Sequence, residues 1–217
     1  MPYTGDVTRG GPADVRELAA LRISKVSVGP MDNNAYLVEC RETGERLLVD
    51  AADDAPTLLE LLGDGGVQQV VTTHQHRDHW QALTEVVSAT GARTAAGRED
   101  AEALPLTVDD LLDDGAEVRV GHVRLGVVHL VGHTPGSVAL VYDDPEGHPH
   151  LFTGDSLFPG GPGRTTRPED FTSLMNDLEA KIFGVLPDAT WFYPGHGKDS
   201  TLGAERPALA EWRARGW

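Results

Sequence analysis

The segment from His74 to His79, His-Gln-His-Arg-Asp-His, concentrates three imidazoles and one carboxylate within six consecutive residues. It directly follows Val-Gln-Gln-Val-Val-Thr-Thr, an apolar run that is typical of a buried strand. Neutral imidazole nitrogens and carboxylate oxygens are ligands that zinc and related divalent cations accept. The segment therefore predicts a metal site on the loop that leaves this strand.

The spacing sends these side chains in two directions. His74 and His76 are two residues apart, so both project to the same side of an extended segment. Asp78 and His79 follow where Trp80 begins a helical pattern. Four ligands from one loop seldom fit one tetrahedral ion, so we expect distant ligands that complete one site or two.

Three further candidates each follow a glycine near the end of an expected strand. They are His133 in Val-Gly-His-Thr-Pro-Gly-Ser, Asp155 in Phe-Thr-Gly-Asp-Ser-Leu-Phe and His196 in Tyr-Pro-Gly-His-Gly. Glycine lets the backbone turn sharply and approach a ligand closely. With the first segment these residues make seven candidate ligands, five His and two Asp, which is enough for two ions that share a bridge.

Short strands and helices alternate along the chain and must position these residues. The strands are expected at 23–28, 35–40, 46–49, 67–73, 93–96, 117–120, 123–130, 137–142, 150–153 and 191–193. The helices are expected at 54–62, 78–89, within 98–103, at 171–183 and in the tail from Leu202. Two strand-rich halves, each accompanied by helices, predict two sheets packed face to face with helices outside.

Length and composition indicate one domain. The chain has 217 residues, 40% of them apolar, which suits a single medium-sized core. We expect that domain to span 21–217, after an N-terminal extension, 1–20, that is rich in glycine, proline and acidic groups and is partly disordered or loosely docked. The single cysteine, Cys40, excludes an intramolecular disulfide and a cysteine-rich zinc finger.

The charge balance limits the partners. A formal charge of −16 repels phosphate backbones and anionic membranes, so a small-molecule substrate is expected rather than nucleic acid or a membrane. No apolar run approaches the length of a membrane span, and the first residues do not resemble a secretory signal. We therefore expect a cytoplasmic enzyme, whose oligomeric state the sequence does not indicate.

The four motifs resemble those of the metallo-β-lactamase superfamily, and within it the glyoxalase II-like hydrolases. The resemblance runs from about Ile23 to Pro207 and includes His-x-His-x-Asp-His, Gly-His-Thr-Pro-Gly, Thr-Gly-Asp and Pro-Gly-His-Gly in the expected order. It implies an α+β fold, a four-layered αβ/βα sandwich of two mixed β-sheets with helices on the outer faces and the site at one edge. It also implies one metal on His74, His76 and His133, a second on Asp78, His79 and His196, and Asp155 as the bridge.

The resemblance implies hydrolysis of a thioester or related ester by a metal-bridging hydroxide. Paired cations lower the pKa of bound water from about 15.7 toward about 7, and Asp78 would orient the hydroxide or take its proton. Zinc is the expected metal, with iron or manganese as alternatives. Full-length glyoxalase II has a C-terminal helical domain with basic glutathione contacts, and this sequence ends before one, so the resemblance does not extend to glutathione.

Other residues have less specific assignments. Arg164 lies in Leu-Phe-Pro-Gly-Gly-Pro-Gly-Arg, which resembles the glyoxalase loop after the bridging Asp, so it is either a ligand for a substrate carboxylate or an exposed arginine. Trp80 and Phe158 are candidate pocket walls. Asp50 ends the strand Leu-Leu-Val-Asp and either orients a ligand imidazole or forms a turn. Of the remaining histidines, His129 is expected in the core and His122, His148 and His150 on the surface.

Three alternatives to a thioesterase remain open. A lactonase uses the same seven ligands, and a persulfide dioxygenase uses a single iron held by two His and one Asp while retaining much of this motif set. The non-enzymatic hypothesis is a metal-binding scaffold or sensor without a substrate pocket. True β-lactamases lack the bridging aspartate, so Asp155 argues against that activity.

Overall fold

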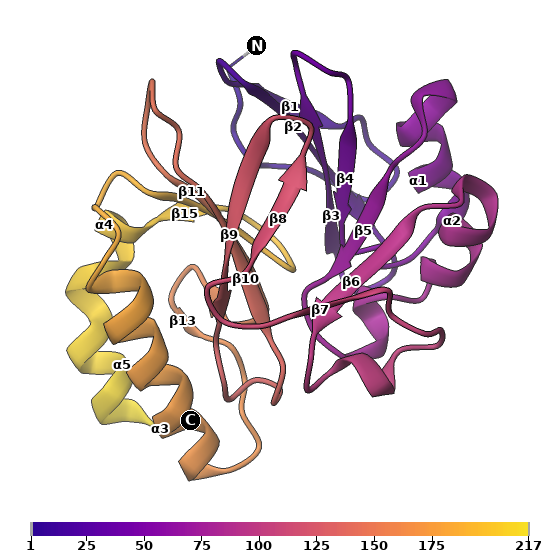
Figure 1. Ribbon diagram of the computed structural model, residues 1–217. Helices are drawn as coiled ribbons and strands as arrows, with labels where there is room; N and C mark the ends of the chain where they lie inside the picture. Colours follow the sequence, from indigo (N-terminus) through magenta and orange to yellow (C-terminus); the bar gives the residue numbers. More distant parts are fainter. Residues whose placement is uncertain (1, 217) are drawn as a thin grey trace.

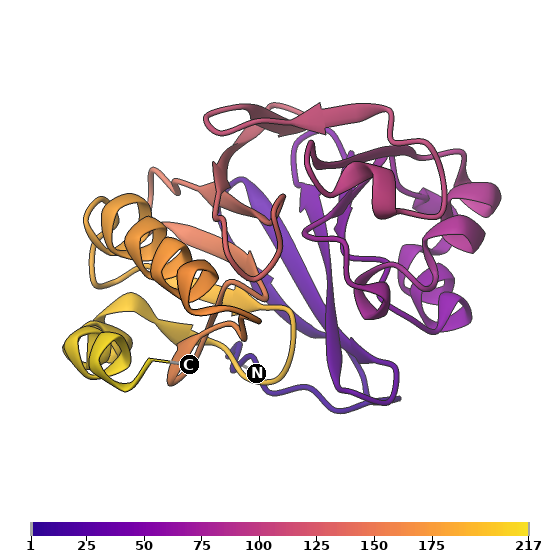
Figure 2. The ribbon, with the colours of Figure 1, turned by 90° about the horizontal axis from the view of Figure 1, so that it is seen from below.

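The computed structural model describes residues 2–216, which form four layers. Two β-sheets pack face to face in the middle, and helices cover the outer face of each sheet (Figures 1 and 2). This is the αβ/βα sandwich expected from the sequence.

The first sheet has the strand order β1-β2-β3-β4-β5-β6-β7. Strands β1 to β4 are antiparallel to their neighbours, and β4 to β7 run parallel. The strands are β1 Asp14–Glu17, β2 Leu21–Val28, β3 Asn33–Cys40, β4 Arg46–Val49, β5 Gln69–Thr72, β6 Arg93–Gly97 and β7 Asp110–Leu112.

The second sheet has the order β15-β14-β11-β10-β9-β8, with a parallel pair, β11 and β14, among antiparallel neighbours. A small hairpin of β12 and β13 follows β11. The strands are β8 Glu117–Val120, β9 Val123–His129, β10 Val138–Tyr142, β11 His150–Gly154, β12 Leu157–Phe158, β13 Gly161–Pro162, β14 Trp191–Pro194 and β15 Ser200–Thr201.

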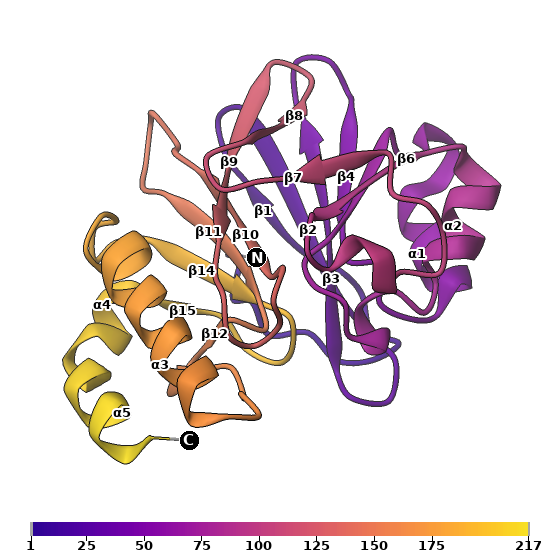
Figure 3. The same cartoon turned by 60° about the horizontal axis from the view of Figure 1, so that its bottom comes forward.

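The helices divide between the two outer faces, as Figure 3 shows. Helices α1 Ala55–Leu62 and α2 Leu83–Thr90 cover the first sheet, and α3 Pro168–Asp177, α4 Leu202–Glu205 and α5 Leu209–Arg215 cover the second. A π-helical turn, Leu178–Phe183, extends α3. Short 3₁₀ turns lie at Gly63–Gly65, Arg77–His79, Ala101–Ala103 and Arg206–Ala208.

Three apolar clusters correspond to the three interfaces between the layers. The cluster between the sheets includes Ile23, Val71, Leu140 and Phe152, all fully buried. A second cluster joins the first sheet to α1 and α2, and a third joins the second sheet to α3 and α5. Successive side chains of a strand point to opposite faces of the sheet, so each sheet contributes apolar side chains to two of these clusters.

The start of α2 differs from the expectation. The sequence predicted a helix from Asp78, whereas the structure has a 3₁₀ turn at Arg77–His79 and begins α2 at Leu83. The intervening backbone bonds elsewhere, because the amide nitrogens of Gln81 and Ala82 donate to the carbonyls of Ala52 and Ala51. This detour turns Asp78 and His79 toward the edge of the sandwich instead of along a helix.

Several short elements were not anticipated, and two histidines were misplaced, since His129, expected in the core, is only half-buried. Strands β1, β7, β12, β13 and β15 have two to four residues each, too few to establish a two-residue period. His150 was expected on the surface, yet it is fully buried at the start of β11, where its Nδ1 lies 2.8 Å from the hydroxyl of Tyr193. Gly147 and Pro149, which are typical of turns, precede His150, so the sequence indicated an open turn where β11 begins.

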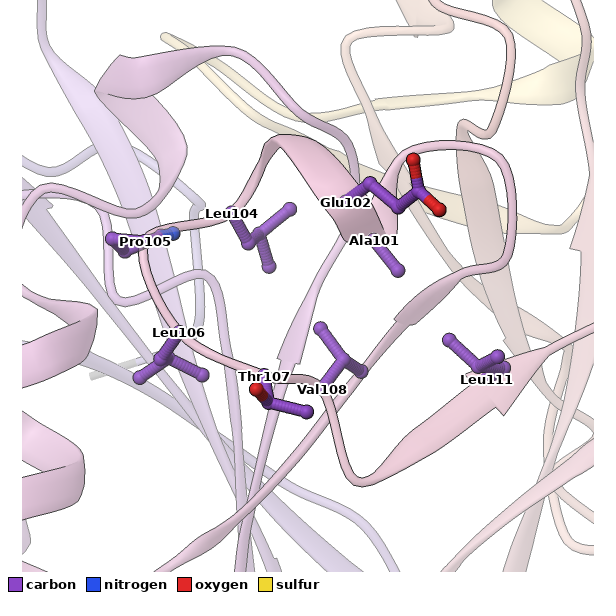
Figure 4. Close-up of a pocket in the computed structure, with 8 residues that line it drawn as sticks. All are labelled: Ala101, Glu102, Leu104, Pro105, Leu106, Thr107, Val108 and Leu111. Carbon is purple, nitrogen blue, oxygen red and sulfur yellow. The ribbon is translucent and has the colours of Figure 1, made fainter.

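A cavity of about 530 Å³ opens beside β7 and is lined by residues between 101 and 111, most of them apolar (Figure 4). None of the seven candidate ligands lines it. Among residues 2–216, no helix has both the length and the apolar character needed to cross a membrane.

Candidate metal centre

Three imidazoles meet at the edge of the sandwich where β5 and β9 end. His74 and His76 follow β5, and His133 lies in the loop between β9 and β10. Nδ1 of His76 is 2.9 Å from Nε2 of His133, which is 3.3 Å from Nε2 of His74. The structure therefore gathers the first set of candidate ligands, whose nitrogens lie within 4.8 Å of one another.

The second set lies beside the first. Asp78 and His79 come from the 3₁₀ turn after β5, and His196 follows β14. Nε2 of His79 is 3.2 Å from Nε2 of His196, and Oδ2 of Asp78 is 3.3 Å from the same atom of His196. These three ligand atoms also lie within 4.8 Å of one another.

Asp155, which directly follows β11, lies between the two sets. Its Oδ1 is 3.4 Å from Nε2 of His79, and its Oδ2 is 3.4 Å from Nε2 of His196. The same Oδ2 is 3.7 Å from Nε2 of His133, a member of the first set. Its carboxylate thus reaches both groups.

The hydrogen bonds behind the imidazoles fit a cation in front of them. Nδ1 of His133 is 2.7 Å from the carbonyl oxygen of Arg164, and Nδ1 of His196 is 2.9 Å from that of Met31. A carbonyl only accepts, so each Nδ1 carries a hydrogen, and Nε2 is the ring nitrogen that faces the other ligands and can give a lone pair to a cation. Oδ1 of Asp155 is buried with no hydrogen-bond partner. These residues fit divalent cations, which accept such lone pairs.

Asp50 stands behind both sets. Its Oδ2 accepts from Nδ1 of His79 at 2.8 Å and from the hydroxyl of Thr73 at 2.8 Å, and that hydroxyl lies 3.1 Å from Nδ1 of His74. The backbone of Asp50 has φ of 60°, an unfavourable value for a residue with a side chain. This strained conformation places the Asp50 carboxylate against the ring of His79 and against Thr73, which in turn contacts the ring of His74.

A family model described as the metallo-beta-lactamase superfamily matches residues 28–196, which include all seven gathered ligands. The chain belongs to the metallo-beta-lactamase superfamily. Its similarity to the superfamily is thus located in the segments that build the site, and the resemblance inferred from the motifs is confirmed.

Two curated relatives carry the name hydroxyacylglutathione hydrolase. The protein of Fuscovulum blasticum is 36% identical over 182 residues, covering 82% of this chain and 67% of its own length. That of Cereibacter sphaeroides (strain ATCC 17029) is 40% identical over 166 residues, covering 76% and 62%. This superfamily member therefore spans about two thirds of the length of the curated relatives that it matches.

One solved structure is similar over nearly its whole length. The crystal structure of TTHA1623 in a di-iron-bound form is 34% identical with a TM-score of 0.69, covering 84% of this chain and 96% of that one. The superfamily fold and the gathered His and Asp side chains together indicate a site for divalent metal ions.

Two residues that sequence reasoning missed hold the loops of this superfamily site. The side-chain amide of Asn33 donates to the backbone carbonyl of Asp78 at 2.8 Å and to its Oδ2 at 3.0 Å. Asp100 accepts from the amide nitrogens of Gln75 and Gly136 and from the hydroxyl of Thr134. Both are buried, and a buried asparagine at the start of an apolar strand was the available signal for Asn33.

Gly195 has no room for a side chain. A Cβ at this position would collide with Oδ1 of Asp155 and with Cε1 of His79. The backbone that leaves β14 must approach the ligands this closely, because the residue after Gly195 is His196. Only glycine permits that approach.

The carboxylates raise the pKa of the histidines in the second set. Burial alone would lower the pKa of His79, but Asp50 and Asp155 raise it to about 10. Burial opposes the effect in His196 as well, yet Asp155 and Asp78 raise its pKa to about 10. A proton here occupies the place that a cation would take, since both respond to the same negative field.

The first set has the opposite tendency. Burial, assisted by the neighbouring His79, holds the pKa of His74 well below its usual value, and burial also lowers the pKa of His133. Burial would raise the pKa of Asp155, but the neighbouring imidazoles of His79 and His196 hold it well below its usual range. His74 and His133 are thus ready to bind a cation without losing protons.

A hollow of about 480 Å³ adjoins the first set. It is lined by His76 and His133 together with Gln75, the rest of the segment 131–135, Thr166, Arg167 and, from the start of α3, Asp170. Its size suits a small organic molecule. Three residues proposed from the sequence as substrate contacts lie outside this lining: Arg164 is exposed, Trp80 donates from Nε1 to the carbonyl of Gln75, and Phe158 lies beside His196 with ring centroids 6.2 Å apart. Their role in substrate binding stays a prediction.

Proposed function

We propose that the protein is a metal-dependent hydrolase that cleaves a thioester or related ester at a centre of two divalent cations. The observation that carries the proposal is the position of Asp155, whose carboxylate oxygens lie 3.4 to 3.7 Å from histidines of both ligand sets. A carboxylate shared by two sets of three ligands is the arrangement that a bridged pair of ions needs.

Bound there, the cations supply Lewis acidity, which polarises a carbonyl and makes a water acidic enough to attack at neutral pH. His74, His76 and His133 would hold the first cation, Asp78, His79 and His196 would hold the second, and Asp155 would be shared between them. No serine or cysteine nucleophile is needed, in keeping with the lone cysteine, Cys40, being buried in β3.

Asp78 is the proposed catalytic side chain. Burial would raise its pKa, but His196, His79 and Asn33 lower it, so it remains a carboxylate at neutral pH. It therefore accepts a hydrogen bond from the attacking water and orients it. Asn33 fixes this carboxylate from behind through the hydrogen bond to Oδ2.

The hollow beside His76 and His133 is the proposed place for the acyl or thiol arm of the substrate. The name of the curated relatives, hydroxyacylglutathione hydrolase, supports a thioester. Those relatives are longer than the matched region, so the proposal extends to the class of bond and does not name glutathione as the thiol.

Zinc is the proposed metal, with iron and manganese as alternatives, because imidazole and carboxylate ligands accept all three. The di-iron form of TTHA1623, at 34% identity, supports two ions per chain and makes iron the first alternative to test. A cytoplasmic location remains the expectation from the sequence.

Metal analysis combined with turnover tests the proposal. The purified protein is assayed for zinc, iron and manganese and then with S-lactoylglutathione, simple thioesters and a lactone panel. Thiol release is the readout for the thioesters, and acid release is the readout that compares thioesters with lactones. We expect about two ions per chain and thioester cleavage that a chelator abolishes. One iron per chain, with oxygen uptake on glutathione persulfide and no hydrolysis, would overturn it in favour of a dioxygenase. Faster turnover of lactones than thioesters would replace the thioesterase with a lactonase.

A further inference from the structure

A fully buried lysine lies behind the second ligand set. Lys25 of β2 has no exposed side-chain surface, and its ammonium group donates three hydrogen bonds. They go to Oδ1 of Asp199 at 2.6 Å, to the carbonyl of Gly197 at 2.7 Å and to the carbonyl of Gly5 at 2.8 Å. All three donors of the ammonium group are therefore used.

Its partner Asp199 is equally buried and equally satisfied. Oδ2 of Asp199 accepts from the hydroxyl of Tyr3 at 2.7 Å and from Nε1 of Trp191 at 3.0 Å. The guanidinium of Arg16 lies over the rings of Trp191 and Tyr3, 4.0 and 4.4 Å from their centroids. The N-terminal segment thus closes over the ion pair.

Gly5 shows how tightly that segment is packed. A Cβ on Gly5 would lie 2.5 Å from Oδ2 of Asp199, and its φ of 74° disfavours any other residue. The segment containing Tyr3 and Gly5 is consequently held by specific contacts with Asp199 and Lys25.

The pair is connected to the metal centre through one carbonyl group. Gly197, whose carbonyl accepts from Lys25, directly follows His196. The same carbonyl accepts from the side-chain amide of Asn34 at 3.0 Å, and the backbone nitrogen of Asn34 donates to Gly195 at 2.7 Å. The backbone on both sides of His196 is thereby fixed to β2 and β3.

Burying two charges costs free energy, and the attraction within the ion pair need not offset that cost. Burial lowers the pKa of Lys25 and raises that of Asp199, each toward its neutral form. Buried ion pairs are often replaceable by apolar residues without loss of stability. Neither residue touches a candidate ligand atom, so their role lies in what their hydrogen bonds hold in place.

We propose that Lys25 and Asp199 are positioning residues for the second metal site, which hold the carbonyl of Gly197 and thereby set His196 in place. The inference rests on the proposed binding of a cation by Asp78, His79 and His196. Removing Lys25 frees the loop on one side of His196, and supports of this kind typically change metal affinity by about 10- to 100-fold.

The test measures the two binding steps of the metal-free protein by zinc titration against a chelating dye. Lys25→Met should weaken the second step by about 10- to 100-fold and leave the first step, on His74, His76 and His133, within about twofold. Tyr3→Phe, which removes one of the bonds to Asp199, should weaken the second step to a smaller extent. Unchanged second-step affinity in Lys25→Met would overturn the inference, as would equal weakening of both steps.

A double variant separates positioning from stability. Lys25→Met with Asp199→Leu removes both charges, so thermal stability should recover relative to the single variant, whereas second-step affinity should stay low because the carbonyl of Gly197 still lacks the hydrogen bond from Lys25. Recovery of metal affinity together with stability would show a purely structural role and overturn the inference. If Lys25→Met fails to fold, the double variant provides the same measurement.

Arg46→Met is a matched control. Arg46 forms a partly buried ion pair with Glu39 at 2.6 Å and also donates to a backbone carbonyl, that of Leu62, but it lies away from the ligands. It should lower stability and leave both binding steps unchanged. The titration needs no substrate, so a protein that binds two cations without cleaving esters would overturn the proposed function and leave this inference standing.

Discussion

Oδ2 of Asp50 lies 2.8 Å from Nδ1 of His79, with both side chains almost completely buried. The same oxygen accepts from Thr73, which in turn contacts His74. One carboxylate therefore supports an imidazole in each ligand set, and it does so from a residue with an unfavourable positive φ. A site with two cations depends on such supports, because they fix which ring nitrogen faces the metal.

Replacing this carboxylate tests the dependence. Asp50→Asn keeps the size of the side chain but removes the charge behind His79, so we expect metal affinity and turnover to fall by about 10- to 100-fold. Chelator competition and thioester turnover measure the two effects. Asp110→Asn, which alters an exposed pair with Arg93, is the control and should match the wild type. Wild-type metal affinity in Asp50→Asn would contradict the account.

A methyl group at position 195 tests the close approach of the backbone that leaves β14. Gly195→Ala introduces a Cβ that collides with Asp155 and His79, so we expect loss of the second cation and a turnover decrease larger than about 100-fold. Gly126→Ala on β9 is the matched control, because its Cβ meets only the carbonyl of Val141 at 4.0 Å. A Gly195→Ala protein that still binds two ions would show that the site is more open than described.

The opposite pKa shifts of the two sets predict different pH dependence. In the metal-free protein His79 and His196 have pKa values raised to about 10, so at neutral pH a cation must displace protons from them. Second-step affinity should therefore rise by about tenfold per pH unit for each displaced proton until the pH approaches 10.

The affinity of the first binding step should depend much less on pH. The pKa values of His74 and His133 are lowered, so these rings are already neutral and the first affinity should change little above pH 7. Proton release into a weakly buffered solution during zinc titration measures both steps. Equal proton release in the two binding steps would contradict the opposite pKa shifts of the two ligand sets.

Filling the hollow beside the first set tests where the substrate lies. Val131→Trp places a large ring in this space of about 480 Å³, so KM should rise by about tenfold or more while both cations remain bound. Val185→Trp, at a position 71% exposed and outside this lining, is the control. An unchanged KM in Val131→Trp would place the substrate elsewhere.

The layers and the clustering of the ligands could be predicted from the sequence because the ligands follow recognisable strands. The candidate ligands His74, His133, Asp155 and His196 each follow closely after a strand, and strands alternating with helices bring such positions to one edge. Period-two patterning marked the longer strands, so both sheets could be expected before their pairing was known.

The supports of the site could not be predicted in the same way. Asn33 and Asp78 are 45 residues apart and Lys25 and Asp199 are 174 apart, so nothing local signals either pair. In Leu-Arg-Ile-Ser-Lys-Val-Ser-Val, Lys25 lies on the same face as Ile23, which is fully buried. A lysine there is unusual enough to prompt a search for a buried partner, but only the fold identifies Asp199.

Stepwise metal loading with thioester turnover measured at each step tests the central claim most directly. Metal-free protein receives zinc, or iron under anaerobic conditions, in increments up to two equivalents per chain. The account predicts that hydrolysis stays low through the first equivalent, rises with the second, and is lost in Asp155→Asn, whose shared carboxylate no longer joins the two sets. Full hydrolysis at one equivalent, or oxygen consumption in place of hydrolysis, would contradict it.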